Sequence, residues 1–184
     1  MTRRGRGVAV LVSVGLAAGC VAGSLYIEAK AVLAQALLER AWSRTAAASG
    51  ARDHRRPWPW ADTWPVARLS VPRLGEHWIV LAGASGRTLA FGPGHLDGTA
   101  LPGDPGHSVV AGHRDTQFAA LGALRLGDVL TVETPERREV RYRVRDMEIV
   151  ERGAGTALAP RSADTLTLVT CWPFDAVVPG GPGR

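Results

Sequence analysis

The chain has 184 residues, which is the length of one domain with short extensions. Lysine and arginine together number 22 against 17 acidic residues, so the formal net charge is +5. No basic run is interleaved with stacking aromatic residues, and this argues against a binder of single-stranded nucleic acid. Twenty-two glycines and 12 prolines suit a turn-rich β protein better than a helical bundle.

The N-terminus predicts a membrane anchor. Residues 1–7 form a basic tail with three arginines, and an uncharged apolar run follows from Val8 to Ile27. Such a run is long enough to cross a hydrocarbon core about 30 Å thick. Positive flanks stay in the cytoplasm, so we expect a single-pass membrane protein whose remaining chain lies outside. A cleaved signal peptide and a lipoprotein box ending at Cys20 are the alternatives.

The two cysteines have different settings. Cys20 lies within the apolar run, and Cys171 lies in the part that we expect to be exported. They cannot pair within one chain if residues 8–27 span the membrane. An unpaired thiol in an oxidising compartment suggests a reactive role for Cys171.

Residues 28–65 connect the anchor to the globular domain. Residues 28–48 are rich in alanine and leucine, and they predict a helix that continues from the membrane. Ser49 to Pro65 reads as a linker because its prolines disfavour regular structure. Its tryptophans, Trp58, Trp60 and Trp64, are expected either at the membrane interface or packed on the domain as a strap.

The globular domain is predicted over residues 66–184. Expected strands are VARLSVPRL, HWIVLAG, HSVVAGHR, DVLTVET, the long segment REVRYRVRDMEIVE, and TLTLVTC. Glycine- and proline-rich loops separate several of them, and DTQFAALGAL reads as a short helix capped by Asp115. Many short strands with one small helix predict a mainly β fold, a barrel or a sandwich.

Two apolar strands end in residues whose side chains can take part in catalysis. VVAGH ends at His113 and TLVTC ends at Cys171. A nearby imidazole favours the thiolate of a cysteine, and neighbouring strand ends would hold the two groups at a fixed separation. Arg184 is a third candidate, because a guanidinium stays charged and donates hydrogen bonds to a developing oxyanion.

These segments resemble the sortases, which are membrane-anchored cysteine transpeptidases. TLVTC matches the TLxTC signature, AGHRD matches the segment around the catalytic histidine, and Arg184 matches the place of the catalytic arginine. The segments PWPWADTWPVARL, LAFGPGHL and TCWPFDAVVPGGP are most similar to the Gram-negative sortase class. The resemblance implies a closed eight-stranded β-barrel with one or two short helices, preceded by the transmembrane helix. It also implies a single-pass protein of the cell inner membrane with its catalytic domain on the periplasmic side.

The resemblance also implies a two-step acyl transfer. Cys171 would attack a carbonyl in an LPxTG-like C-terminal sorting signal of an exported protein, and His113 would protonate the leaving amine. An amine acceptor would then resolve the thioester. The family role of Arg184 is to bind substrate and the oxyanion, and Thr170 and Trp172 beside the cysteine are expected to contact substrate.

Other readings stay open at this stage. Ordinary packing is an alternative role for Trp172 and Phe174, as an inert buried thiol is for Cys171. We expect no cofactor and no metal, since Asp97 and Asp104 alone are too few ligands for calcium. A cysteine hydrolase with the same dyad and a catalytically impaired envelope-anchored binding module are the competing functions.

The position of Arg184 at the end of the sequence raises a further expectation. In sortases the strand with the arginine continues and closes the barrel, so the last strand here is expected to be missing, through truncation or in an impaired protein. Extending the C-terminus by a short apolar strand is then predicted to raise both stability and activity.

Overall fold

A computed structural model describes residues 3–47, 55–151 and 163–175. The chain forms two compact units, Met1–Ala36 and Leu37–Arg184. The helix α1 (Arg3–Ala47) is continuous for 45 residues, so the expected anchor and the expected helix after it are one element. Its stretch Ala18–Thr45 is long and apolar enough to cross a membrane, with a mean hydropathy of 1.3.

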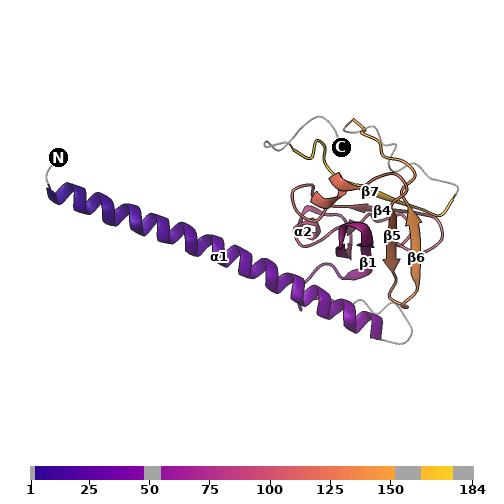
Figure 1. The fold of residues 1–184 in the computed structure, drawn as a ribbon. Helices are drawn as coiled ribbons and strands as arrows, with labels where there is room; N and C mark the ends of the chain where they lie inside the picture. The colour runs from indigo at the N-terminus through magenta and orange to yellow at the C-terminus, as the bar shows by residue number, and fades with distance from the viewer. Residues whose placement is uncertain (1–2, 48–54, 152–162, 176–184) are drawn as a thin grey trace. The chain divides into compact units, whose positions relative to one another are not determined.

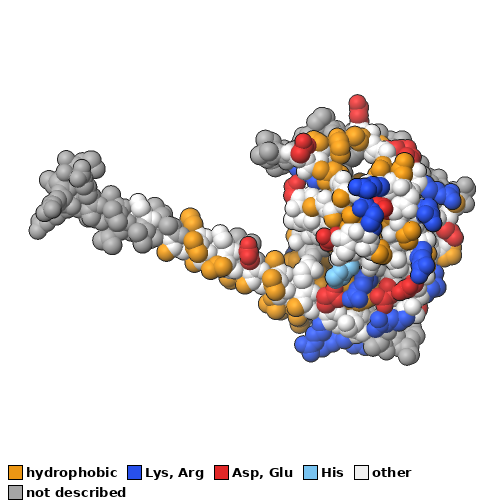
Figure 2. Space-filling model, in the orientation of Figure 1, with side chains coloured by type: hydrophobic (Ala, Val, Ile, Leu, Met, Phe, Trp, Pro, Cys, Tyr) orange, Lys and Arg blue, Asp and Glu red, His pale blue; other side chains and the backbone are white. Residues whose placement is uncertain are grey.

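Apolar side chains of the first unit are open to solvent. They include Val21, Leu25, Tyr26, Val32 and Leu33, each more than half exposed. Figure 2 shows hydrophobic side chains, in orange, along the described part of the helix. The expected span at residues 8–27 overlaps the candidate span only in part.

The second unit is built on one sheet of seven strands (Figure 1). The strands follow the order β6-β5-β1-β2-β3-β4-β7 across the sheet. Their bounds are β1 (Pro65–Val71), β2 (Glu76–Ala82), β3 (Gly94–His95), β4 (His107–Ala111), β5 (Val129–Glu133), β6 (Glu139–Arg143) and β7 (Thr165–Val169). Short helices lie between them: η1 (Pro72–Leu74), α2 (Gly86–Leu89) and η2 (Ala119–Ala123). The described residues thus contain seven strands where eight were expected.

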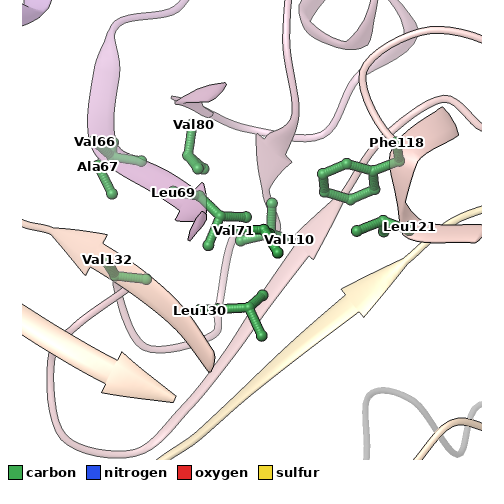
Figure 3. Packing of buried hydrophobic residues seen from close by; sticks show 10 residues of the cluster. All are labelled: Val66, Ala67, Leu69, Val71, Val80, Val110, Phe118, Leu121, Leu130 and Val132. Atoms are coloured by element: carbon green, nitrogen blue, oxygen red, sulfur yellow. The ribbon is translucent and has the colours of Figure 1, made fainter. Parts of the chain in front are cut away.

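The sheet curls into a nearly closed barrel around one core. Ten buried residues fill it, and Figure 3 shows them: Val66, Ala67, Leu69, Val71, Val80, Val110, Phe118, Leu121, Leu130 and Val132. Tyr142 of the outer strand β6 and Leu166 and Leu168 of the outer strand β7 pack against this same core. The sheet must therefore bend until its two outer strands face a common interior.

Strand β6 is much shorter than the sequence predicts. The expected strand REVRYRVRDMEIVE covers 14 residues, and the observed one covers Glu139–Arg143. Its partner β5 is only five residues long, and the antiparallel register ends with Val129 opposite Arg143. The ladder stops there because, among the residues that the structure describes, β5 does not extend beyond Val129, although the alternating sequence after β6 continues.

The end of α1 belongs to the second unit. Leu38 and Trp42 are almost fully buried and pack with Ile79 and Leu81 of β2 in a second, smaller core. Trp58 contacts Phe91 edge to face at a centroid distance of 4.9 Å.

Trp64 packs against the main core, whereas Trp60 is 82% exposed. Trp58 and Trp64 thus pack the linker onto the domain, which is the second of the two alternatives given for these tryptophans.

Candidate active site

The candidate site lies where β4 and β7 end beside each other (Figure 1). The two strands are parallel neighbours, and their register runs from His107 opposite Thr165 to Ala111 opposite Val169. The Gly112 amide continues the ladder by donating to the Val169 carbonyl at 3.0 Å. The prediction that the two strands are neighbours is confirmed.

His113 and Cys171 occupy equivalent places in the two segments. Each follows the last paired residue of its strand, Ala111 or Val169, by two positions. Both residues are exposed, and Cys171 is a free thiol. The strands end earlier than the sequence predicts, so both residues stand on short segments just past the sheet edge.

Thr170 and Gly112 join these two segments. The Thr170 hydroxyl donates a hydrogen bond to the Gly112 carbonyl at 2.9 Å. With the hydrogen bond from the Gly112 amide to the Val169 carbonyl, this gives two links between Gly112, just before His113, and the two residues before Cys171. A side chain that was expected to contact substrate therefore also fixes the backbone of the site.

Gly112 is a point of close approach. A Cβ atom placed there would lie 2.6 Å from Cδ2 and 2.7 Å from Cγ of Phe118. Phe118 is fully buried and stacks edge to face on Trp78 at 5.7 Å. The ring occupies the volume that any side chain at position 112 would need, so the sequence before His113 requires glycine.

Aromatic residues follow the cysteine. Trp172 is 40% exposed and meets Phe174 edge to face at 5.7 Å. Phe174 in turn lies over Gly122, where a Cβ atom would come within 3.1 Å of its ring. Phe174 is thus packed on the domain, and Trp172 presents an aromatic surface beside Cys171.

The segment after His113 differs from the expected helix. Residues 114–118 form turns, and the 3-10 helix η2 begins only at Ala119. Asp115 accepts a hydrogen bond from Arg114 Nε at 2.7 Å instead of capping a helix. The amides of Thr116 and Phe118 both donate to the His113 carbonyl, which closes the turn.

Arg114 is a residue of the site that sequence reasoning missed. It is only 6% exposed, and its Nη1 donates to the Pro173 carbonyl at 2.7 Å. Its pKa is raised, first by the hydrogen bond to Asp115 and further by attraction to Cys171 and Asp175. The residue stands beside His113 in AGHRD, but nothing in that segment distinguishes it from the many other arginines of the chain.

Three of the other histidines have contacts away from this edge. His107 Nε2 lies 2.8 Å from Thr167 Oγ1, and His95 Nε2 lies 2.9 Å from the Ala100 carbonyl. His77 Nε2 lies 3.8 Å from Glu39. His54 falls outside the described residues, so His113 is the histidine that the fold places next to the Cys171 segment.

Two further expectations concern Arg184 and a metal. Arg184 lies outside the described residues. Among the residues that the structure describes, no group of three or more His, Cys, Asp or Glu side chains is placed to hold a metal ion. Asp104 instead pairs with Arg138 at 3.1 Å.

Comparison with known proteins settles the family. The sortase domain matches residues 69–184, which is more than half of the chain. The chain belongs to the sortase family. Sortases are cysteine transpeptidases, and the nearly closed barrel is their fold.

Individual relatives agree with this assignment. Sortase D of Bacillus subtilis is 29% identical over 110 residues, which are 59% of this chain and 55% of that protein. The chain therefore spans about half the length of that relative. Sortase C-1 of Actinomyces oris is 36% identical, with a TM-score of 0.55 over 61% of this chain and 68% of that one.

A third similarity concerns the fold alone. The structure of the Clostridium perfringens sortase D5 transpeptidase is 19% identical and has a TM-score of 0.66. It covers 83% of this sortase and 94% of that chain.

Proposed function

We propose that this sortase is a cysteine transpeptidase in which Cys171 is the nucleophile and His113 the general acid and base. The observation that carries the proposal is the parallel pairing of β4 with β7, which brings the His113 and Cys171 segments to one sheet edge. The family assignment supports the same chemistry. An imidazole beside the thiol would favour the thiolate, the form of cysteine that attacks carbonyls.

The reaction has two balanced steps. Cys171 sulfur attacks the scissile carbonyl of a sorting signal of LPxTG type, the C–N bond breaks, and His113 gives a proton to the leaving amine. The product is a thioester. An acceptor amine then attacks the thioester carbonyl, His113 takes the amine's proton, the C–S bond breaks as the new amide forms, and the Cys171 thiolate is restored. General acid catalysis of this kind contributes about 10²–10⁴-fold.

Arg184, Thr170 and Trp172 complete the proposed site. Arg184 would donate to the oxyanion of both tetrahedral intermediates, the role that its place after the cysteine implies. Trp172 offers an exposed aromatic face beside Cys171 for the substrate's side chains. Thr170 holds the segment that bears the sulfur and borders the same edge.

The proposed setting is the cell envelope. The helix α1 would anchor the protein by a single span, with the catalytic unit on the periplasmic side of the inner membrane, as in the Gram-negative class. The partners are an exported protein with a C-terminal sorting signal and an amine acceptor. Protease digestion of intact spheroplasts and of lysed cells tests this: only lysis would expose the domain if it faced the cytoplasm.

The decisive test uses the full chain in detergent with Cys20→Ser, so that Cys171 is the only thiol. A peptide with an LPxTG-type motif is added, with or without hydroxylamine, and intact-mass spectrometry follows the protein. We expect an acyl adduct on Cys171 and a peptide hydroxamate that forms only with hydroxylamine. Cys171→Ala and His113→Ala should abolish both, and Arg184→Ala should slow them strongly.

A readout without substrate completes the test. Iodoacetamide should alkylate native Cys171 faster than the same residue in the urea-unfolded chain, and His113→Ala should remove the difference. Equal rates in the native and the unfolded chain would contradict an activated thiol. A peptide acid that forms equally fast with and without an amine would instead favour the hydrolase.

A further inference from the structure

A buried guanidinium lies between the two segments of the proposed site. Arg114 follows His113 directly, and it is 6% exposed. Arginine is almost never buried unless it is paired, because the charge loses its hydration. Here the side chain donates to the Asp115 carboxylate through Nε and to the Pro173 carbonyl through Nη1, both at 2.7 Å.

These bonds connect the histidine and cysteine segments beyond the reactive residues. Gly112 and Thr170 join the two segments just before His113 and Cys171. Arg114 and Pro173 join them just after. The sulfur and the imidazole therefore stand on two short segments that are tied together at both ends.

We propose that Arg114 is a positioning residue, which holds the Cys171 segment against the His113 segment and keeps a positive charge beside the sulfur. The proposal rests on the transpeptidase function proposed above. Arginine suits this place because its planar fork donates in two directions at once, to a carboxylate and to a carbonyl. A lysine would keep the charge, but its compact ammonium group would lack the planar fork of donors that reaches both acceptors.

The charges around Arg114 determine how much of its field reaches the thiol. Asp115 is 68% exposed and shares the Nε donor, so solvent screens part of that carboxylate. Asp175 and Cys171 contribute attraction from the β7 side, and His113 precedes Arg114 in the chain. Asp115 and Asp175 are the anions that face the guanidinium, which supplies a positive charge to a thiolate whether or not His113 is protonated.

The test compares variants at position 114 with a matched arginine elsewhere. Arg138 also donates to a carbonyl and a carboxylate, those of Gly103 at 2.6 Å and Asp104 at 3.1 Å. Neither partner belongs to the site. The full chain with Cys20→Ser is prepared as Arg114→Gln, Arg114→Lys and Arg138→Gln, and each is followed by iodoacetamide alkylation from pH 5 to 9 and by hydroxamate formation.

Arg114→Gln should slow alkylation of Cys171 at neutral pH, because the variant loses the positive charge that attracts a thiolate. Its transfer rate should fall at least as much. Arg114→Lys should keep the alkylation profile near that of the parent protein but still lose transfer rate, because the charge is kept and the fork is lost. Arg138→Gln should leave both profiles in place.

The outcomes separate this inference from the proposed function. If the parent protein forms the acyl adduct while Arg114→Gln matches it in alkylation profile and transfer, the role of Arg114 is overturned and the transpeptidase stands. If Arg114→Gln does not fold, Arg114→Lys carries the test: parental transfer would overturn the positioning role. Failure of the parent protein to form any adduct refutes the proposed function itself.

Discussion

Replacing Gly112 by alanine tests how tightly the site is built. The new Cβ atom would lie 2.6 Å from the Phe118 ring, a distance that Cβ atoms do not tolerate. The ring is fully buried and held against Trp78, so it has little room to move. Overpacking of this kind costs about 1–3 kcal/mol, and the melting temperature should fall by about 3–10 °C for a domain of this size.

The assay is thermal unfolding by circular dichroism, with two companion variants. Gly86→Ala is the matched control, because nothing lies within 4 Å of a Cβ atom there. It should leave the melting temperature equal or slightly higher. Phe118→Leu makes room at the ring, so the double variant should lose less stability than the sum of the two single variants, by at least about 0.5 kcal/mol.

Two results would refute the reasoning. The first is a Gly112→Ala protein that melts within about 1 °C of the parent protein, since overpacking would then cost nothing measurable. The second is strict additivity with Phe118→Leu, which would place the cost of the new methyl group somewhere other than the ring. Cys171 alkylation in the same variants shows whether the displaced backbone also disturbs the thiol.

Three further predictions follow from single contacts. Thr170→Val should cost about 1 kcal/mol, because it loses the donor to the Gly112 carbonyl, whereas Thr170→Ser should keep most of the stability; equal losses in chemical denaturation would contradict this. Hydrogen bonds from Arg73 hold the pKa of Asp128 below its ordinary value of 3.8, so its charge stabilises the fold above that value, and this contribution is lost as pH falls through the lowered pKa. Asp128→Asn should therefore be less stable than the parent protein at neutral pH, and the difference should shrink as the pH falls below 3.8. A constant difference across an acid titration would exclude the ion pair as the cause. Trp42→Ala should cost about 3–5 kcal/mol in urea unfolding if the end of α1 is part of the domain core, and an unchanged midpoint would show that it is not.

The residue pattern alone was sufficient to locate the strands that carry the candidate site. Alternation and apolar runs located β1, β2, β4 and β7, because each has a face that must be buried. The motif then placed His113 and Cys171 at the ends of two strands, and the pairing of β4 with β7 confirms that these strands are neighbours. Both ends were predicted two residues late, since sequence does not show where a ladder loses its partner.

The remaining features depend on tertiary contacts that no local pattern records. The alternation after β6 continues past Arg143, but the five-residue partner β5 sets the length of the strand. Asp115 has the chemistry of a helix cap, yet the neighbouring Arg114 takes its carboxylate. The role of Arg114 could not be predicted because arginine is so common in this chain. Of the 22 basic residues 21 are arginine, so the residue type alone does not mark one of them as part of the site.

The parallel arrangement of β4 and β7 has a consequence for when reactivity arises during biogenesis. Parallel neighbours require a long crossover, and here Gly112 and Thr170 are 58 residues apart along the chain. No hairpin or local fragment can bring them together, so β7 must dock on β4 before the His113 and Cys171 segments lie side by side. If the domain is exported as proposed, the chain crosses the membrane with the Cys171 and His113 segments still apart, and the proposed dyad assembles only after translocation.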